Sequence, residues 1–142
     1  IASLFAADRL DHLLNEANGL ATKIEAGTTV ISDRYYLSSY AYHSVDMPME
    51  QVIAMNAPSR DLLRPELHIF VDIDPDTAVA RIAANRQHTE LFEKKTRLAK
   101  TRECYMNAIE KLQGEENIVI IDGTQSIEEI AEEVWMNVKK YF

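Results

Sequence analysis

Residues 67–75 read Leu-His-Ile-Phe-Val-Asp-Ile-Asp-Pro. The apolar run up to Ile73 predicts a buried strand, and Asp74-Pro75 predicts the N-cap and first residue of a following helix. Two more apolar, β-branched runs, at 28–32 and 118–121, also predict strands, and helical patterns lie between them. Strands that alternate with helices are typical of a parallel, two-faced α/β sheet.

Helical patterns fill most of the remaining chain. In residues 1–26, apolar side chains recur at helical spacing, which predicts one core-facing helix with a kink at Asn18-Gly19 and an end at Gly27. The residues of this stripe are Leu10, Leu13, Leu14, Ala17, Leu20, Ala21 and Ile24. Further helices are predicted over 36–42, over 49–56 with Asp46 or Pro48 at its start, from Pro75 onward, and up to Leu112.

Ser126 and Glu129 form a predicted capping box for a last helix, which we expect to reach Tyr141. In the helix from Pro75, four residues are predicted to point inward: Ala78, Val79, Ile82 and Ala83. The chain contains no repeat, low-complexity tract or linker, which predicts a single domain over residues 1–142.

Composition excludes several classes of protein. The chain has 142 residues, of which 46% are hydrophobic and 27% charged, as in a folded globular domain. Its formal net charge of −8 argues against a nucleic-acid-binding protein, because such binding needs an excess of Lys and Arg. No apolar run approaches the roughly 20 residues of a membrane span. A single cysteine, Cys104, excludes an intrachain disulfide and predicts a cytoplasmic location.

Candidate ligand-binding residues follow the predicted strands, because open parallel sheets bind ligands at the carboxyl ends of their strands. Asp33-Arg34 follows the first strand, and Arg34 would hold an anion or else belong to a surface turn with a local ion pair. Asp72-Ile73-Asp74 follows the second strand and invites a metal site, although a helix cap explains Asp74 better. Residues 122–124 follow the third strand.

Two other features are candidates for ligand binding. Phe5, Asp8, Arg9 and His12 share the polar face of the first helix, where Phe5 would stack on a planar ligand or pack under a loop. A basic segment follows, which would attract a nucleoside triphosphate or form a solvated helix. Its basic residues are Arg81, Arg86, Lys94, Lys95, Arg97, Lys100 and Arg102.

The four glycines form no phosphate-binding motif within residues 1–142, and the four histidines show no metal-ligand spacing. Three motifs carry a more specific signal, namely LFAADR at 4–9, VISDRY at 30–35 and SSYAY at 38–42. In this order they resemble the thymidylate kinase family of P-loop enzymes. Supporting segments occur at 64–67, 71–75, 89–94, 100–105 and 121–129, so the resemblance covers essentially the whole chain from Leu4.

The resemblance implies roles for the acceptor side of the site. Phe5 would stack on the thymine ring, and Arg9 would hydrogen-bond the edge of the base. Arg34 would hold the acceptor phosphate, with Asp33 orienting it or lying near Mg²⁺. Ser39 would contact the base or sugar, and Tyr42 would lie under the deoxyribose and disfavour a 2′-hydroxyl.

The same resemblance implies a donor side and a lid. Arg81 would pack against adenine, beside a loop made of Gly123, Thr124 and Gln125. Residues 86–94 would form the lid, including Arg86, Phe92 and Glu93. This chain departs from the family at Phe92, where Tyr or Ile is common, and at Ala99, near the position of a family Gln. No residue is assigned as a metal ligand.

The implied fold is a P-loop kinase-like, five-stranded parallel sheet with helices on both faces and the strand order 2-3-1-4-5. The predicted strands would be the third, fourth and fifth. The first two strands and the P-loop are expected about fifty residues before Leu4, as a βαβ unit plus a helix. Without them, residues 1–142 would have unpaired strand edges and would be inactive.

The implied activity is ATP-dependent phosphorylation of dTMP to dTDP in dTTP biosynthesis, with ATP and Mg²⁺, by a homodimer that needs neither nucleic acid nor membrane. Two alternatives remain. One is a kinase for another deoxynucleoside or deoxynucleotide. The other is a non-catalytic homologue without a P-loop, which binds a nucleotide or a partner.

Overall fold

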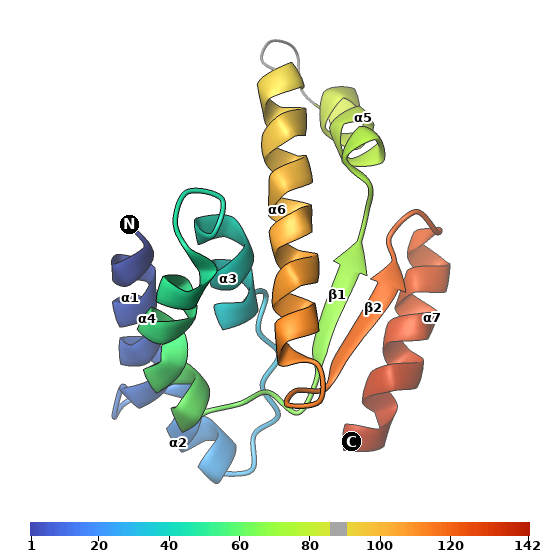
Figure 1. Cartoon of the computed structure of the whole chain (residues 1–142). Helices are drawn as coiled ribbons and strands as arrows, with labels where there is room; N and C mark the ends of the chain where they lie inside the picture. Colours follow the sequence, from blue (N-terminus) through green and yellow to red (C-terminus); the bar gives the residue numbers. More distant parts are fainter. Residues whose placement is uncertain (86–90) are drawn as a thin grey trace. The chain divides into compact units, whose positions relative to one another are not determined.

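The computed structural model describes residues 1–85 and 91–142 (Figure 1). Their contacts divide the chain into two compact units, Ile1–Arg64 and Pro65–Phe142. The single domain expected from the sequence stays a prediction.

The first unit consists of four helices: α1 (Ala2–Leu14), α2 (Leu20–Glu25), α3 (Tyr36–His43) and α4 (Met49–Leu62). Helix α4 packs against both α1 and α3. The core between these helices contains the fully buried side chains of Leu13, Tyr36, Tyr40 and Val52. Burial of these four side chains is the main apolar contribution that holds α1, α3 and α4 together.

The single helix predicted for residues 1–26 is wrong, because the chain breaks between α1 and α2 instead of kinking. The Asn15 side chain accepts hydrogen bonds from the backbone N–H groups of Ala17 and Asn18, which replaces helical hydrogen bonds by a turn. The predicted stripe is therefore only partly buried. Leu13 is buried, whereas Leu14 is 55% exposed.

The strand predicted at 28–32 is also wrong. These residues form no helix or strand, and Ile31 is 88% exposed. A strand in a parallel sheet needs neighbours to satisfy its backbone N–H and C=O groups. Within the described residues, the only ladder joins the two strands of the second unit.

Helix α3 confirms the prediction for 36–42, and α4 confirms the start at Met49, with Pro48 at the N-cap. However, α4 continues six residues past its predicted end at Asn56 and includes Pro58. Proline removes one helical hydrogen bond but does not end this helix, and its neighbours Asn56 and Ser59 are both buried.

The second unit contains a two-stranded parallel sheet of β1 (His68–Asp72) and β2 (Ile118–Asp122), paired in register from His68 with Ile118 to Asp72 with Asp122. Its helices are α5 (Pro75–Asn85), α6 (Leu91–Leu112) and α7 (Ile127–Val138), followed by a 3₁₀ turn, η1 (Lys139–Tyr141). Helix α5 packs on α6, and α7 packs on β2. Figure 1 shows α6 running alongside β1.

The face of the sheet that carries Phe70 and Asp72 meets α6. Phe70 stacks on Tyr105 with ring centroids 4.6 Å apart. Both carboxylate oxygens of Asp72 accept hydrogen bonds from Arg102, from Nε and Nη2, each at 2.7 Å. Asp72 is therefore held in a bidentate ion pair, which explains its position at the strand end without a metal ion.

Both predicted helix caps of this unit are confirmed. Asp74 accepts a 2.9 Å hydrogen bond from the backbone N–H of Thr77, and Ser126 with Glu129 forms the reciprocal capping box. The inward face predicted for α5 is partly wrong, since Ile82 is 40% exposed. The last helix ends at Val138 and tightens into η1, instead of reaching Tyr141.

Candidate functional site

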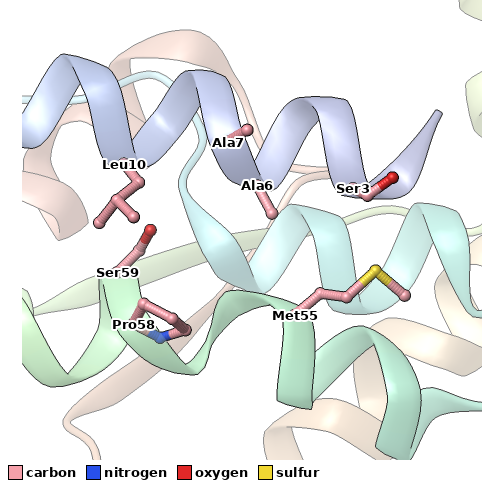
Figure 2. Close-up of a pocket in the computed structure, with 7 residues that line it drawn as sticks. All are labelled: Ser3, Ala6, Ala7, Leu10, Met55, Pro58 and Ser59. Atoms are coloured by element: carbon pink, nitrogen blue, oxygen red, sulfur yellow. The ribbon is translucent and has the colours of Figure 1, made fainter.

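The packing of α1 on α4 positions the first set of candidate residues. Small side chains on α1, such as Ala6, let the two helices approach closely, and Ala6 is only 8% exposed. A cavity of about 240 Å³ lies along this contact, lined on the α4 side by Met55, Pro58 and Ser59. Figure 2 shows Ala6 and Leu10 of α1 facing these α4 residues. This close packing brings Arg9 within reach of α4.

Arg9 lies at the meeting point of three helices. Its Nη2 donates a 2.9 Å hydrogen bond to Ser39 Oγ on α3, and its Nη1 donates to Asn56 Oδ1 on α4. The guanidinium carbon also lies 5.7 Å from the ring centroid of Tyr35, within cation–π range. Burial lowers the pKa of Arg9, while Tyr35, Tyr40 and Asp8 act in the opposite direction. The structure thus joins two predicted site residues, Arg9 and Ser39.

Phe5 lies one turn before Arg9 on α1 and is 53% exposed. Its ring centroid is 5.5 Å from that of His43, at an interplanar angle of 47°. Burial lowers the pKa of His43, and Arg9 lowers it further. His43 therefore offers Phe5 a mostly neutral ring at neutral pH, and about half of the Phe5 side chain stays accessible to a ligand.

Arg34 and Tyr42 form a second pair in this unit. Arg34 Nη2 donates a 3.3 Å hydrogen bond to Tyr42 Oη, and the guanidinium carbon lies 4.9 Å from the Tyr42 ring centroid. Arg34 has a backbone φ of 71°, a conformation that costs a non-glycine residue about 1 kcal/mol or more. Asp33 precedes it on the same exposed turn.

Asn56 is a site residue that sequence reasoning missed. It is 1% exposed, and its Nδ2 donates a 2.8 Å hydrogen bond to the Val52 carbonyl, one turn earlier on α4. The sequence did contain a sign that Asn56 has a special role, because asparagine has low helix propensity and here stands between the apolar residues Met55 and Ala57 of α4. The sequence did not show which residue it meets.

The second set of candidate residues lies in the second unit, at the carboxyl end of β2. Arg81 on α5 donates a 2.9 Å hydrogen bond from Nη1 to the Gly123 carbonyl. A Cβ atom at Gly123 would lie 2.7 Å from the Asp72 carbonyl oxygen, so only glycine fits there. Both the N–H and the hydroxyl of Thr124 donate to Asp122 Oδ1, at 2.8 and 2.7 Å.

These two Thr124 hydrogen bonds lower the pKa of Asp122. Gln125 is held separately, since its Nε2 donates to Glu133 Oε2 at 3.3 Å. The structure therefore joins Arg81 to the loop of residues 123–125 through the Gly123 carbonyl.

The predicted lid, residues 86–94, lies largely outside the residues that the structure describes. Arg86 lies outside the described residues, as do the side chains of Phe92 and Glu93, whose backbone belongs to the first turn of α6. Across residues 1–85 and 91–142, no three His, Cys, Asp or Glu side chains gather to hold a metal ion. The same residues contain no helix long and apolar enough to cross a membrane.

Comparisons with known proteins match nearly the whole length of this chain. A family model described as thymidylate kinase matches residues 1–134. The "Probable thymidylate kinase" of Pyrobaculum calidifontis is 35% identical over 134 residues, which are 94% of this chain and 64% of that protein.

Two further relatives agree. The thymidylate kinase of Acholeplasma laidlawii is 36% identical over 98% of this chain and 68% of its own length. The "Probable thymidylate kinase" of Methanosphaera stadtmanae is 36% identical over 99% of this chain and 66% of its own length. The chain thus spans about two thirds of the length of the curated relatives it matches. It belongs to the thymidylate kinase family.

Proposed function

We propose that this chain carries the acceptor site of an enzyme that transfers a phosphoryl group from ATP to dTMP, forming ADP and dTDP. One observation supports this most directly: a half-exposed aromatic ring and an arginine lie one turn apart on α1, with that arginine held by two neutral side chains. An open ring face beside a fixed guanidinium suits a planar base with a carbonyl at its edge.

In this proposal the base stacks on the exposed face of Phe5, and Arg9 donates to the edge of the base. Ser39 assists, because its hydroxyl already lies against the Arg9 guanidinium. The deoxyribose lies over the ring of Tyr42, which disfavours a 2′-hydroxyl. Arg34 exchanges its contacts with Tyr42 for the phosphate of the acceptor, which forms stronger, charge-assisted hydrogen bonds.

Phosphoryl transfer asks the protein mainly to align two nucleotides and to offset the negative charge that develops on the transferred group. Arg34 supplies positive charge at the acceptor phosphate, and Asp33 orients that guanidinium or lies near the metal. Mg²⁺, which proteins commonly bind through one or two carboxylates and the substrate phosphates, would neutralise phosphate oxygens of ATP. Asp33 is exposed and able to supply such a carboxylate.

The adenine of ATP would meet Arg81 and the loop of Gly123, Thr124 and Gln125. The residues present suit such a role, because Arg81 is already anchored on the Gly123 carbonyl and presents a planar cation beside the loop. Residues 86–94, with Arg86, Phe92 and Glu93, would close as the lid. No residue is assigned as a metal ligand.

We also propose that the P-loop of the donor site comes from outside residues 1–142, and that residues 1–142 alone are inactive. Residues 28–32 would then become the third strand of a five-stranded sheet when a neighbouring strand pairs with them. The resemblance further supports a cytoplasmic homodimer. Finding Gly-x4-Gly-Lys-Ser/Thr about fifty codons upstream of Leu4 in the gene would support this proposal, and a genuine start codon near Ile1 would contradict it.

The activity is tested with the complete polypeptide in which residues 1–142 occur. ADP release is measured with ATP, Mg²⁺ and a panel of acceptors: dTMP, dUMP, dCMP, dGMP and thymidine. We expect dTMP to give the highest kcat/KM. A higher value for thymidine or for another deoxynucleotide would replace dTMP as the substrate. Saturable dTMP binding without ADP release would instead identify a non-catalytic homologue.

A further inference from the structure

Asn56 has one possible orientation of its side-chain amide. Its Nδ2 lies 2.8 Å from the Val52 carbonyl, which can only accept a hydrogen bond, so the amide nitrogen must face Val52. Its Oδ1 then faces Arg9, whose guanidinium can only donate. The two neighbours thus require the same orientation, and burial to 1% exposure keeps water from competing for either contact.

Arg9 is fixed in plane as well as in position by these contacts. Its two terminal nitrogens are held by side chains on two different helices, Asn56 on α4 and Ser39 on α3. Because a guanidinium is planar, hydrogen bonds at both terminal nitrogens define the orientation of the whole group. They use two of its five N–H donors.

Both side chains that hold Arg9 are neutral. A carboxylate at either position would neutralise the guanidinium and compete directly with a ligand for it. An amide and a hydroxyl instead orient the cation and leave its charge to act on a ligand. Arg9 is partly buried, which lowers its pKa, so the cation gains from an added acceptor.

We propose that Asn56 is the positioning residue for Arg9: it sets the plane in which Arg9 donates to a carbonyl oxygen at the edge of the acceptor base. This inference rests on the proposed function. A base with an amino group at the same edge would place its N–H donors against those of Arg9, and neither group would have an acceptor. Asn56 thereby sets the preference for a base with a carbonyl at that edge, such as thymine, over cytosine.

The test compares Asn56→Leu, which removes the acceptor but keeps the branched shape of the side chain, with Val52→Ala on the same helix. Val52 is fully buried, so its truncation measures the effect of a destabilised α4 while the Asn56 amide stays in place. KM and kcat are measured for dTMP and dCMP with the complete polypeptide, and Tm is measured for each variant. If Asn56→Leu does not fold, Asn56→Ala, which a helix accommodates well, takes its place.

In Asn56→Leu we expect KM for dTMP to rise about tenfold, kcat to stay within about twofold, and the dTMP-over-dCMP ratio of kcat/KM to fall about tenfold. Val52→Ala is expected to lower Tm and leave the KM and the ratio unchanged. In an Arg9→Ala background, Asn56→Leu should raise KM no further, because Asn56 acts through Arg9.

The outcomes separate the two proposals. A wild-type protein that phosphorylates dTMP, with an Asn56→Leu variant of unchanged KM and base preference, would overturn the role of Asn56 and leave the proposed function in place. The role of Asn56 would also be overturned if Asn56→Leu raised the KM for dTMP equally in the wild-type and Arg9→Ala backgrounds. A wild-type protein that neither binds nor phosphorylates dTMP would overturn the proposed function, and the inference with it.

Discussion

Replacing Phe5 by alanine separates a ligand-stacking ring from one that merely packs. Fully burying a phenylalanine side chain stabilises a protein by about 2–3 kcal/mol. Phe5 is 53% exposed, so its truncation should cost the fold only about half of that, roughly 1 kcal/mol. Stacking of a base on an aromatic ring is worth about 1–3 kcal/mol, which corresponds to a roughly five- to 150-fold weakening of binding.

The assay measures KM for dTMP and for ATP, together with the free energy of unfolding, in the complete polypeptide. We expect a large rise in KM for dTMP, a small loss of stability and an unchanged KM for ATP. Leu4→Ala is the matched control, because Leu4 precedes Phe5 on α1, is also apolar and is 71% exposed. It should change none of the three quantities appreciably.

Two results would refute this reasoning about Phe5. One is a KM for dTMP that stays within about twofold of wild type in Phe5→Ala, which would mean that the ring touches no ligand. The other is an equal rise in KM for Leu4→Ala, which would trace the effect to a loosened α1.

Three further predictions follow from individual contacts. Arg34→Ala should raise KM for dTMP and lower kcat, each by about tenfold or more, because a charge-assisted contact to phosphate is lost; unchanged steady-state kinetics would remove Arg34 from the site. Arg81→Ala should raise KM for ATP by a few fold and leave KM for dTMP unchanged; the reverse pattern would place Arg81 on the acceptor side. The hydroxyl of Thr77, followed by its backbone N–H, lowers the pKa of Asp74, so this cap stabilises the fold above the ordinary carboxyl pKa and is lost as pH falls through the lowered value. Thr77→Val should therefore raise the Asp74 pKa, measured by NMR titration of the carboxyl carbon, and the protein should unfold at a higher pH during acid titration. An unchanged Asp74 pKa in this variant would contradict the assigned cause.

Local signals in the sequence predicted two helix starts and both strands of the second unit. Asp74-Pro75 and the Ser126–Glu129 pair predicted two helix starts that the structure confirms, because a cap needs only side chains within three residues. The strands at His68–Asp72 and Ile118–Asp122 were predicted to within a residue or two at each end, since both are short apolar runs bounded by polar residues.

Predictions that depended on distant partners fared worse. Residues 28–32 have a strand-like composition, but pairing decides whether such a run becomes a strand, and no described residue pairs with them. Likewise, the break after Leu14 depends on the Asn15 side chain, which competes with the helix for backbone N–H groups. The spacing of apolar residues alone does not reveal such competition for hydrogen bonds.

The candidate site shows the same division. Phe5 and Arg9 could be identified on one helix face from their spacing, and the structure keeps them one turn apart. The contact of Arg9 with Asn56 joins residues 47 positions apart, so no local pattern predicts it. Arg34, which pairs with Tyr42, has a positive φ that its residue type does not favour, so the local sequence did not predict this backbone conformation.

The most direct test of the acceptor site is an NMR measurement of magnetisation transfer between dTMP and the Phe5 ring in the complete polypeptide. Phe5 is identified by comparing spectra of the wild type and Phe5→Ala, with phenylalanine rings isotopically labelled. If the thymine stacks on Phe5, the 5-methyl protons of bound dTMP will show cross-peaks to that ring, and these peaks will disappear in Phe5→Ala. Saturable binding of dTMP with cross-peaks only to other residues would contradict the account.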